Sequence, residues 1–454
     1  MVTVAATGPT PVPSRRRRSG PVPTWRLGAA AAVLSVVAAL LPLATPWGVL
    51  VVFAALLVAA GFDWAVAVTP DRIEVTRVLP ASLTLGQHGQ VAWEVANPSR
   101  RSLRVALADE FPPSLQATSR RARLTVPARG RATATTAVCP LRRGDFSPAE
   151  LVVRVEGPLG LVARQGKRTD RGLLRVFPPF RSKQEAELRI DRARILEVGL
   201  RSAKARGGGT EFEQLRDYSE DDEFRRIDWA ATARAGRPIV RTYRAERNQV
   251  VIVLLDNGRL MAGRVDEVPR LEHAMDAVMM LTAVATRLGD RIGLVVFDRR
   301  VRAVVPPTQT RAQFGRIVQA MYRLEPELAE SDFRGAFTET LARFRRRALL
   351  VILTELADQA VQETLLRDLP LVARSHLVLI GAVRDPDVQR WAESEPTEAG
   401  TAYRKAAAIA ALADRRRLVG LLGTMGATVV DAPPGELAPR LADAYLRVKA
   451  TGQL

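Results

Sequence analysis

The carboxy-terminal half of the chain alternates short apolar runs with longer amphipathic stretches, and this alternation limits the folds available to it. The apolar runs have the length of strands and lie at residues 250–255, 292–297, 301–305, 349–354, 377–381 and 428–430. The stretches of helical character lie at residues 271–288, 312–322, 333–346, 361–373, 403–425 and 436–449. Apolar strands that alternate with helices are typical of a mostly parallel sheet covered on both faces. The pattern predicts an α/β doubly wound domain over residues 250–454.

Two acidic residues follow strands of this predicted sheet. Asp256 comes directly after the first apolar run, and Glu355 comes directly after the fourth. In doubly wound folds, ligands bind beyond the carboxyl ends of the strands. Both side chains are therefore candidate site residues.

The charge of the chain is strongly positive. Among its 454 residues, 67 Lys and Arg face 48 Asp and Glu, a formal net charge of +19, and nearly all the cations are arginines. A nucleic-acid partner is one interpretation, but the arginines are scattered, aromatic residues are only 5%, and no nucleic-acid motif is found. We expect attraction to an anionic membrane leaflet instead, and no nucleic-acid partner. The single cysteine, Cys139, excludes an internal disulfide.

The amino-terminal region predicts a membrane anchor. Residues 1–24 form a basic tail of disordered composition, and residues 25–68 carry no charge except Asp63. Their length suits two short transmembrane helices, at 25–41 and 47–66, joined by a proline-containing turn. A cleaved signal peptide is the alternative, but the second apolar run argues against it. With two crossings the protein would be a multi-pass protein of the cell membrane, and the bulk of the chain would be cytoplasmic; one crossing would reverse this.

The middle region, residues 69–180, predicts a β-sandwich-like domain. Short alternating runs such as 91–95, 103–107 and 151–155 are separated by turn residues. No catalytic cluster is visible there, so we expect a spacer or a binding module.

The segment 181–249 contains a dense polar block, and residues 206–244 read RGGGTEFEQLRDYSEDDEFRRIDWAATARAGRPIVRTYR. This block resembles the signature of the domain-of-unknown-function 58 family, whose common form is G-x-G-x-E-F-x-x-L-R-x-Y-x-x-G-D-D-x-R-x-I-D-W-x-x-x-A-R. Glu220 stands where the family has a glycine. If that glycine has a positive φ, the turn here differs in shape. The resemblance implies a β-domain before the block and a von Willebrand factor A-like domain after it.

The resemblance also raises the question of a metal site. Domains of the von Willebrand factor A type often bind Mg²⁺ through D-x-S-x-S, a loop threonine and a later aspartate. In this chain Asp256 is kept, whereas Gly258 and Leu260 replace both serines. Ser331 and Glu355 could stand for the other two positions, and Arg259 could neutralise Asp256. Because two of the usual oxygen ligands are lost, we expect no cofactor, and Mg²⁺ binding is disfavoured.

The signature block itself offers paired charges rather than a reaction centre. The three glycines lack the context of a phosphate loop. Asp222 suits the N-cap of a helix over residues 223–233, and Trp229 offers a face for a guanidinium. Arginine–carboxylate pairs would make the block either a rigid platform that a partner protein recognises or a clasp within the fold. The residues that would form it are Glu211, Arg216, Asp221, Asp222, Arg226, Asp228, Trp229 and Arg234.

These observations lead to one functional expectation and two rivals. Because the chain lacks a nucleophile motif and a metal-spaced His/Cys group, we expect no enzyme but a membrane-anchored scaffold that binds proteins. The family resemblance implies a MoxR-type AAA+ ATPase as partner, in complex assembly or envelope maturation. The first alternative is a metal-dependent ligand-binding or adhesion protein using Asp256, Ser331 and Glu355. The second is a hydrolase that works through the signature carboxylates.

Overall fold

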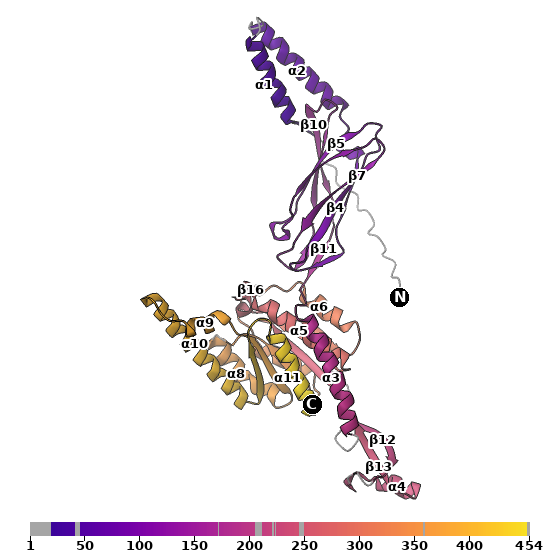
Figure 1. Cartoon of the computed structure of the whole chain (residues 1–454), viewed down its shortest axis with the longest axis vertical. Coiled ribbons are helices and arrows are strands. Elements are labelled where there is room, and N and C mark those ends of the chain that lie inside the picture. Colours follow the sequence, from indigo (N-terminus) through magenta and orange to yellow (C-terminus); the bar gives the residue numbers. More distant parts are fainter. Residues whose placement is uncertain are drawn as a thin grey trace. The chain divides into compact units, whose positions relative to one another are not determined.

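The computed structural model describes residues 20–40, 46–170, 172–204, 211–219, 222, 224–244, 249–356 and 359–451 (Figure 1). The chain divides into two compact units, Met1–Phe177 and Pro178–Leu454. Each unit has its own sheets and its own core, as expected for a chain of this length.

The first unit begins with two apolar helices, α1 (Trp25–Leu40) and α2 (Pro46–Val66). Within the described residues, only the helical stretch Trp47–Arg72 is both long and apolar enough to cross a membrane. Helix α1 has 16 residues, which at 1.5 Å per residue is short for a bilayer core of about 30 Å. The turn expected between the helices lies almost entirely outside the described residues.

Asp63, the one charge in the apolar stretch, is fully buried against the β-domain. Its carboxylate accepts hydrogen bonds from the backbone N–H groups of Leu159, Leu161 and Val162, at 2.7, 2.8 and 2.9 Å. The chain also reaches α1 from a strand, β1 (Gly20–Pro23), which pairs with β10 (Val162–Thr169). Both ends of the helical pair are therefore fixed at the same turn of the β-domain.

The β-domain is a sandwich whose sheets share one apolar core. One sheet has the order β1-β10-β9-β5-β6, and the facing strands form the sheets β2-β4-β7 and β3-β11-β8. The strands not yet given are β2 (Glu74–Val78), β3 (Ser82–Thr84), β4 (Gly89–Ala96), β5 (Leu103–Asp109), β6 (Arg121–Val126), β7 (Arg131–Val138), β8 (Gly144–Phe146), β9 (Glu150–Glu156) and β11 (Leu174–Phe177). Alternate residues of β5 and β9 point into the core, as the alternation in the sequence predicts.

A fully hydrogen-bonded ion pair lies inside this sandwich. Arg77 donates to both carboxylate oxygens of Asp109, at 2.8 and 2.7 Å, and Trp93 donates to the same carboxylate at 2.7 Å. The remaining guanidinium nitrogen donates to the carbonyls of Pro148 and Asp170. Because every charged group is satisfied, the pair fixes these strands without leaving an uncompensated buried charge.

The second unit is built on a six-stranded sheet of order β18-β17-β14-β19-β20-β21. Its strands are β14 (Val250–Asp256), β17 (Arg291–Phe297), β18 (Val301–Thr308), β19 (Leu349–Leu353), β20 (Leu377–Val383) and β21 (Ala427–Ala432). All neighbours are parallel except β17 and β18. The six predicted strands all form, and the strand order reverses between β14 and β19, where doubly wound folds place their ligand sites.

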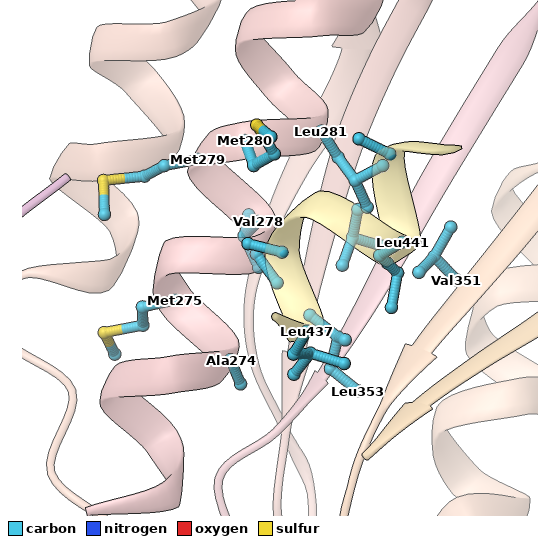
Figure 2. Packing of buried hydrophobic residues seen from close by; sticks show 14 of the residues in the cluster. Ala274, Met275, Val278, Met279, Met280, Leu281, Val351, Leu353, Leu437 and Leu441 are labelled. Atoms are coloured by element: carbon cyan, nitrogen blue, oxygen red, sulfur yellow. The ribbon is translucent and has the colours of Figure 1, made fainter. Parts of the chain in front are cut away.

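Helices cover both faces of this sheet. One face packs against α5 (Arg270–Arg287), α6 (Gln313–Met321), α11 (Leu437–Thr451) and the first turns of α3 (Lys183–Lys204); the other packs against α7 (Phe333–Arg343), α8 (Gln359–Ala373) and α10 (Ala399–Thr424). Figure 2 shows the first face, where Leu437 and Leu441 of α11 lie between α5 and the β19 side chains Val351 and Leu353. This two-sided packing explains why the first six residues of β14 are all apolar and show no alternation.

Candidate functional site

Asp256 ends β14 at the point where the strand order reverses, and it is almost completely buried, with 1% of its surface exposed. One carboxylate oxygen accepts from Ser331 Oγ at 2.5 Å and from Gly258 N at 2.8 Å. The other accepts from Thr354 Oγ1 at 2.6 Å. The structure thus places Ser331 at Asp256, as predicted. It also places Thr354 there, whereas the sequence predicted the neighbouring Glu355.

Burial raises the pKa of the Asp256 carboxyl above its ordinary value, because the charged form loses its hydration. The hydrogen bonds from Ser331, Thr354 and Gly258 act in the opposite direction, and the nearby Asp298 adds to the rise. Asp298 is itself held by Arg302, whose Nε donates to it at 2.6 Å. The carboxylate of Asp256 therefore depends on two hydroxyls and one backbone N–H for its stabilisation.

The glycine at position 258 leaves room for the hydroxyl of Ser331. A Cβ atom on Gly258 would overlap Ser331 Oγ, and it would lie 3.2 Å from the carboxylate of Asp256. Position 258 has no side-chain hydroxyl, and the hydroxyl of Ser331 donates to Asp256 in its place. Leu260, the other departure from the metal motif, packs against the apolar core.

Glu355 is buried, with 1% exposed, but its carboxylate interacts with two arginines rather than with Asp256. Arg270 Nε lies 2.7 Å from one oxygen, and Arg415 pairs with the other. Arg415 also donates to both oxygens of Asp431, at 3.0 and 2.8 Å. Two arginines and two carboxylates therefore form a nearly closed, internally neutral cluster.

The residues at this edge of the sheet do not fit a divalent cation. Mg²⁺ prefers about six oxygen ligands in an octahedral shell and is usually held by one or two carboxylates. Here both oxygens of Asp256 already accept hydroxyl protons, and Glu355 is neutralised by Arg270 and Arg415. In the described part of the chain, no three His, Cys, Asp or Glu side chains are grouped so that they could hold a metal. Arg259, the residue proposed to neutralise Asp256, makes an ion pair with Glu330 at 3.8 Å.

The signature block forms an antiparallel hairpin of β12 (Glu211–Asp217) and β13 (Ile239–Arg244), joined through a 3-10 turn (Phe224–Arg226) and the short helix α4 (Trp229–Ala235). Within it, Arg216 and Asp222 make the expected bidentate pair, with N–O distances of 2.8 and 2.5 Å. Ser219 N donates to the same carboxylate at 2.9 Å. Asp222 thereby holds the end of β12 and the following turn in one shape.

Asp228, and not Asp222, caps the helix of this block. The predicted cap at Asp222 is wrong, because that carboxylate is taken by Arg216 and the helix begins only at Trp229. Asp228 accepts from Ala230 N and Ala231 N, both at 3.0 Å, and its other oxygen accepts from Arg241 at 2.7 Å. These hydrogen bonds, the backbone one from Ala231 first and the one from Arg241 next, lower the pKa of Asp228.

The block presents two exposed aromatic rings. Phe224 is 67% exposed and Trp229 is 62% exposed, and their rings meet edge to face with centroids 5.7 Å apart. Among the described side chains, the ring contact of Trp229 is with Phe224, and Arg234 Nε donates to the Ala230 carbonyl at 3.2 Å. Of the other predicted block residues, Asp221 and the side chains of Glu211 and Arg226 lie outside the described residues.

Both buried histidines of the second unit contact the backbone. His376 Nδ1 accepts from the backbone of Ala348 at 3.2 Å, and His273 Nε2 lies 3.4 Å from the Val265 carbonyl. Burial lowers the pKa of both imidazoles. These contacts are those of structural side chains within helices and loops of the core.

The fold and the block define a class of protein. It has an α/β domain with a buried, hydrogen-bonded carboxylate where the strand order reverses, and a hairpin with arginine–carboxylate ion pairs precedes this domain. Residues 214–398 match the model of the family described as "Protein of unknown function DUF58". Proteins described as "Uncharacterized protein Rv1480" from Mycobacterium tuberculosis and "Uncharacterized protein Mb1516" from Mycobacterium bovis are each 25% identical over 182 residues, which is 40% of this chain. The match spans 56% of the length of these curated relatives.

Solved structures show only weak overall similarity. The conserved hypothetical protein BatB from Bacteroides thetaiotaomicron is 14% identical and covers 45% of this chain and 100% of its own, with a TM-score of 0.29. The α2-macroglobulin of Escherichia coli is 18% identical over 23% of this chain and 6% of its own, with a TM-score of 0.19. The family match agrees with the resemblance found in the signature block, and it covers the hairpin and most of the sheet.

Proposed function

We propose that this chain is a membrane-anchored, non-enzymatic scaffold and that its hairpin, residues 211–244, docks a partner protein. The observation that carries the proposal is the exposed pair Phe224 and Trp229. Tryptophan is enriched at the energetic centres of protein interfaces, where a rigid ring loses little conformational entropy on binding. Two exposed rings in contact therefore favour a docking surface over a purely internal clasp.

The charge pairs beneath these rings support the same interpretation. Asp222 and Asp228 have side-chain exposures of only 8% and 9%, and each is bonded both to an arginine and to backbone N–H groups. A surface that is already fixed in shape pays less entropy when a partner binds. In this proposal the ion pairs of Asp222 and Asp228 fix the shape of the hairpin, and the rings of Phe224 and Trp229 contact the partner.

For the partner we propose a MoxR-type AAA+ ATPase, with a role in complex assembly or envelope maturation. This assignment rests on the resemblance of the signature block to its family, and the block is also the segment with the exposed aromatic pair. The following domain, which we propose is of the von Willebrand factor A type, would act as a rigid support. Its sealed Asp256 and the arginine-bound Glu355 favour such a role over metal-dependent adhesion.

For the anchor we propose a helical hairpin with both of its ends at the cytoplasmic face of the cell membrane. Two features support it: β1 pairs with β10 immediately before α1, and Asp63 near the end of α2 binds the turn that precedes β10. If both ends lie at one side, the bulk of the chain lies there too, together with Arg15, Arg16, Arg17 and Arg18.

The test is copurification of the full-length tagged protein with the MoxR-type ATPase of the same cell, with ATP, with ADP and without nucleotide. We expect retention in at least one nucleotide state, and about tenfold or greater loss of affinity in Trp229→Ala or Phe224→Ala. Tyr403→Ala is the matched control, because Tyr403 is an exposed aromatic residue (79%) outside the hairpin. Failure of the wild type in every nucleotide state would reject the partner, whereas equal binding by Trp229→Ala would reject the hairpin surface.

A second pair of variants separates docking from folding of the platform. Asp222→Asn weakens the bidentate pair with Arg216, while Asp217→Asn changes a carboxylate that is 59% exposed and only 3.2 Å from Arg237. We expect the first to lower partner affinity and the second to leave it unchanged. Equal effects of the two variants would mean that charge, and not the shape of the platform, determines binding.

A further inference from the structure

Two arginine side chains converge on the turn of the β-domain from which the apolar helices extend. Gly160 has a φ of +73°, and a Cβ atom placed on it would lie 2.7 Å from a terminal nitrogen of Arg26 and 2.8 Å from one of Arg104. Arg26 belongs to the first turn of α1, and Arg104 belongs to β5. The two guanidinium groups therefore point at the same small space beside the glycine.

The positive charge at this place exceeds its internal compensation. Arg104 pairs with Glu156 at 3.2 Å. For Arg26 the structure gives no carboxylate partner among the described residues, and residues 1–62 contain no Asp or Glu at all. Asp63, the other acid at this turn, is fully buried and engaged by three backbone N–H groups. A cation in the first turn of a helix is also unfavourable to the helix dipole, so an external anion would relieve both this and the repulsion between Arg26 and Arg104.

The surroundings have the composition of a membrane surface. Trp25 is 74% exposed, Leu159 is 53% exposed and Trp64 is 38% exposed, all next to the same turn. A third arginine, Arg164, lies over the Trp64 ring at 4.9 Å and donates to the Trp64 carbonyl. Tryptophan rings beside arginines are characteristic of the headgroup layer, where the rings stay half-buried and the guanidinium groups meet phosphates.

We propose that Arg26 and Arg104 bind the phosphate of an anionic phospholipid beside Gly160, with Trp25 and Trp64 in the same headgroup layer. Guanidinium groups bind phosphate through paired, charge-assisted hydrogen bonds, and two of them can reach different oxygens of one phosphodiester. The site would hold the β-domain against the bilayer surface. It rests on the proposed membrane insertion of α1 and α2.

The test uses the full-length protein in neutral detergent micelles, with phosphatidylglycerol, phosphatidylcholine or inorganic phosphate added at equal concentration. Binding is measured from the rise in the thermal unfolding midpoint, since at a given concentration a ligand that binds the folded state more tightly stabilises it more. We expect phosphatidylglycerol to raise the midpoint more than phosphatidylcholine, and inorganic phosphate to have no effect. An equal response to inorganic phosphate would overturn the assignment to a lipid.

Arg26→Gln/Arg104→Gln should weaken the phosphatidylglycerol response, by roughly fivefold in affinity for each arginine. Arg121→Gln/Arg175→Gln is the matched control, because it removes two exposed arginines from other strands of the same β-domain. The variant Arg26→Lys/Arg104→Lys should keep most of the response if charge is what matters. An unchanged response in the glutamine variant, or an equal loss in the control, would overturn the site.

Alkaline carbonate extraction of membranes separates this proposal from the one on which it rests. We expect wild type and the Arg26→Gln/Arg104→Gln variant to remain equally in the membrane fraction. Extraction of the wild type would reject membrane insertion itself. Retention of both proteins without any preference for phosphatidylglycerol would reject only the lipid site.

Discussion

Two places in the second unit contain buried carboxylates: the edge of the sheet formed by the carboxyl ends of its parallel strands, and the hairpin of β12 and β13. They differ in which side chains beside the carboxylates are exposed to solvent. At this edge Asp256 and Glu355 are each 1% exposed; both oxygens of Asp256 accept hydrogen bonds from hydroxyls, and the oxygens of Glu355 form ion pairs with two arginines. In the hairpin, Asp222 and Asp228 are bound just as closely by arginines and backbone. The same hairpin, however, presents two aromatic rings to solvent.

If the hairpin is the docking surface that we propose, the usual ligand position of the fold is not the working surface of this chain. Doubly wound sheets bind ligands where the strand order reverses. In this chain the carboxylates at that position already contact hydroxyls and arginines of the same domain. Interaction surface is instead available on the hairpin that precedes the sheet. Variants of Asp256, Gly258 and Glu355 test how firmly these carboxylates are held.

The largest effect is expected from breaking the arginine cluster. Glu355→Ala removes the carboxylate between Arg270 and Arg415, so that Arg270 loses its ion pair and Asp431 alone faces two arginines. Removal of one partner of a buried ion pair costs about 3–5 kcal/mol. We expect a loss of this size in the free energy of unfolding, measured by urea denaturation.

Glu330→Ala provides the matched control for that loss. Glu330 has a side chain that is 74% exposed, and it lies 3.8 Å from Arg259. Exposed ion pairs contribute less than about 1 kcal/mol, so this variant should be close to wild type. Equal losses in the two variants would mean that Glu355 is not part of a buried, closed cluster.

Sequence reasoning predicted the framework of this site better than its contacts. The strands and the position of Asp256 follow from apolar runs and chain order, whereas Ser331 was implied only by the resemblance to von Willebrand factor A-type domains. Thr354 and Glu355, the two residues after β19, show where this prediction fails. Side chains alternate in direction along an extended chain, so two neighbours face different ways. The prediction chose the carboxylate, whereas the hydroxyl of Thr354 reaches Asp256.

The remaining contacts depend on residues far apart in the chain. Arg415 meets Glu355 across 60 residues, and Asp63 meets the turn at Leu159 across 96. No local pattern identifies such partners. The sequence signal that was available is indirect: a lone carboxylate in an apolar stretch requires donors from elsewhere, because a buried charge cannot remain unpaired.

A smaller loss is expected when the missing serine of the metal motif is restored. Gly258→Ser places a side chain in the space that Ser331 Oγ occupies, and overfilling of a packed site costs about 1–3 kcal/mol. The double variant Gly258→Ser/Ser331→Ala should recover much of this loss, because it removes the overlapping hydroxyl. A double-mutant cycle of unfolding free energies measures the coupling, and additive effects would contradict the overlap.

The pH dependence of stability tests the burial of Asp256. Its pKa is raised on folding, so the folded state holds the proton more tightly than the unfolded chain does. The contribution of this group to stability is therefore greatest below about pH 4 and falls as the pH rises through the folded-state pKa, by at most about 1.4 kcal/mol per pH unit. Asp256→Asn removes this loss, so the variant should gain stability relative to wild type with increasing pH. A difference that does not change with pH would show that Asp256 is not buried as a carboxylate.

The smallest effect on stability is expected from added Mg²⁺. A cation at Asp256 would have to displace the hydroxyl protons of Ser331 and Thr354, and Glu355 could join it only by leaving two arginines. Asp256 would then be the only carboxylate ligand, and the two hydroxyl oxygens and water would have to complete the near-octahedral shell that Mg²⁺ needs. We therefore expect millimolar Mg²⁺ or Mn²⁺ to leave the unfolding midpoint of wild type unchanged, and calorimetry to detect no binding that Asp256→Ala abolishes. An Asp256-dependent heat of binding would show that the edge opens for a cation, and the contrast between a sealed sheet edge and an open hairpin would then have to be given up.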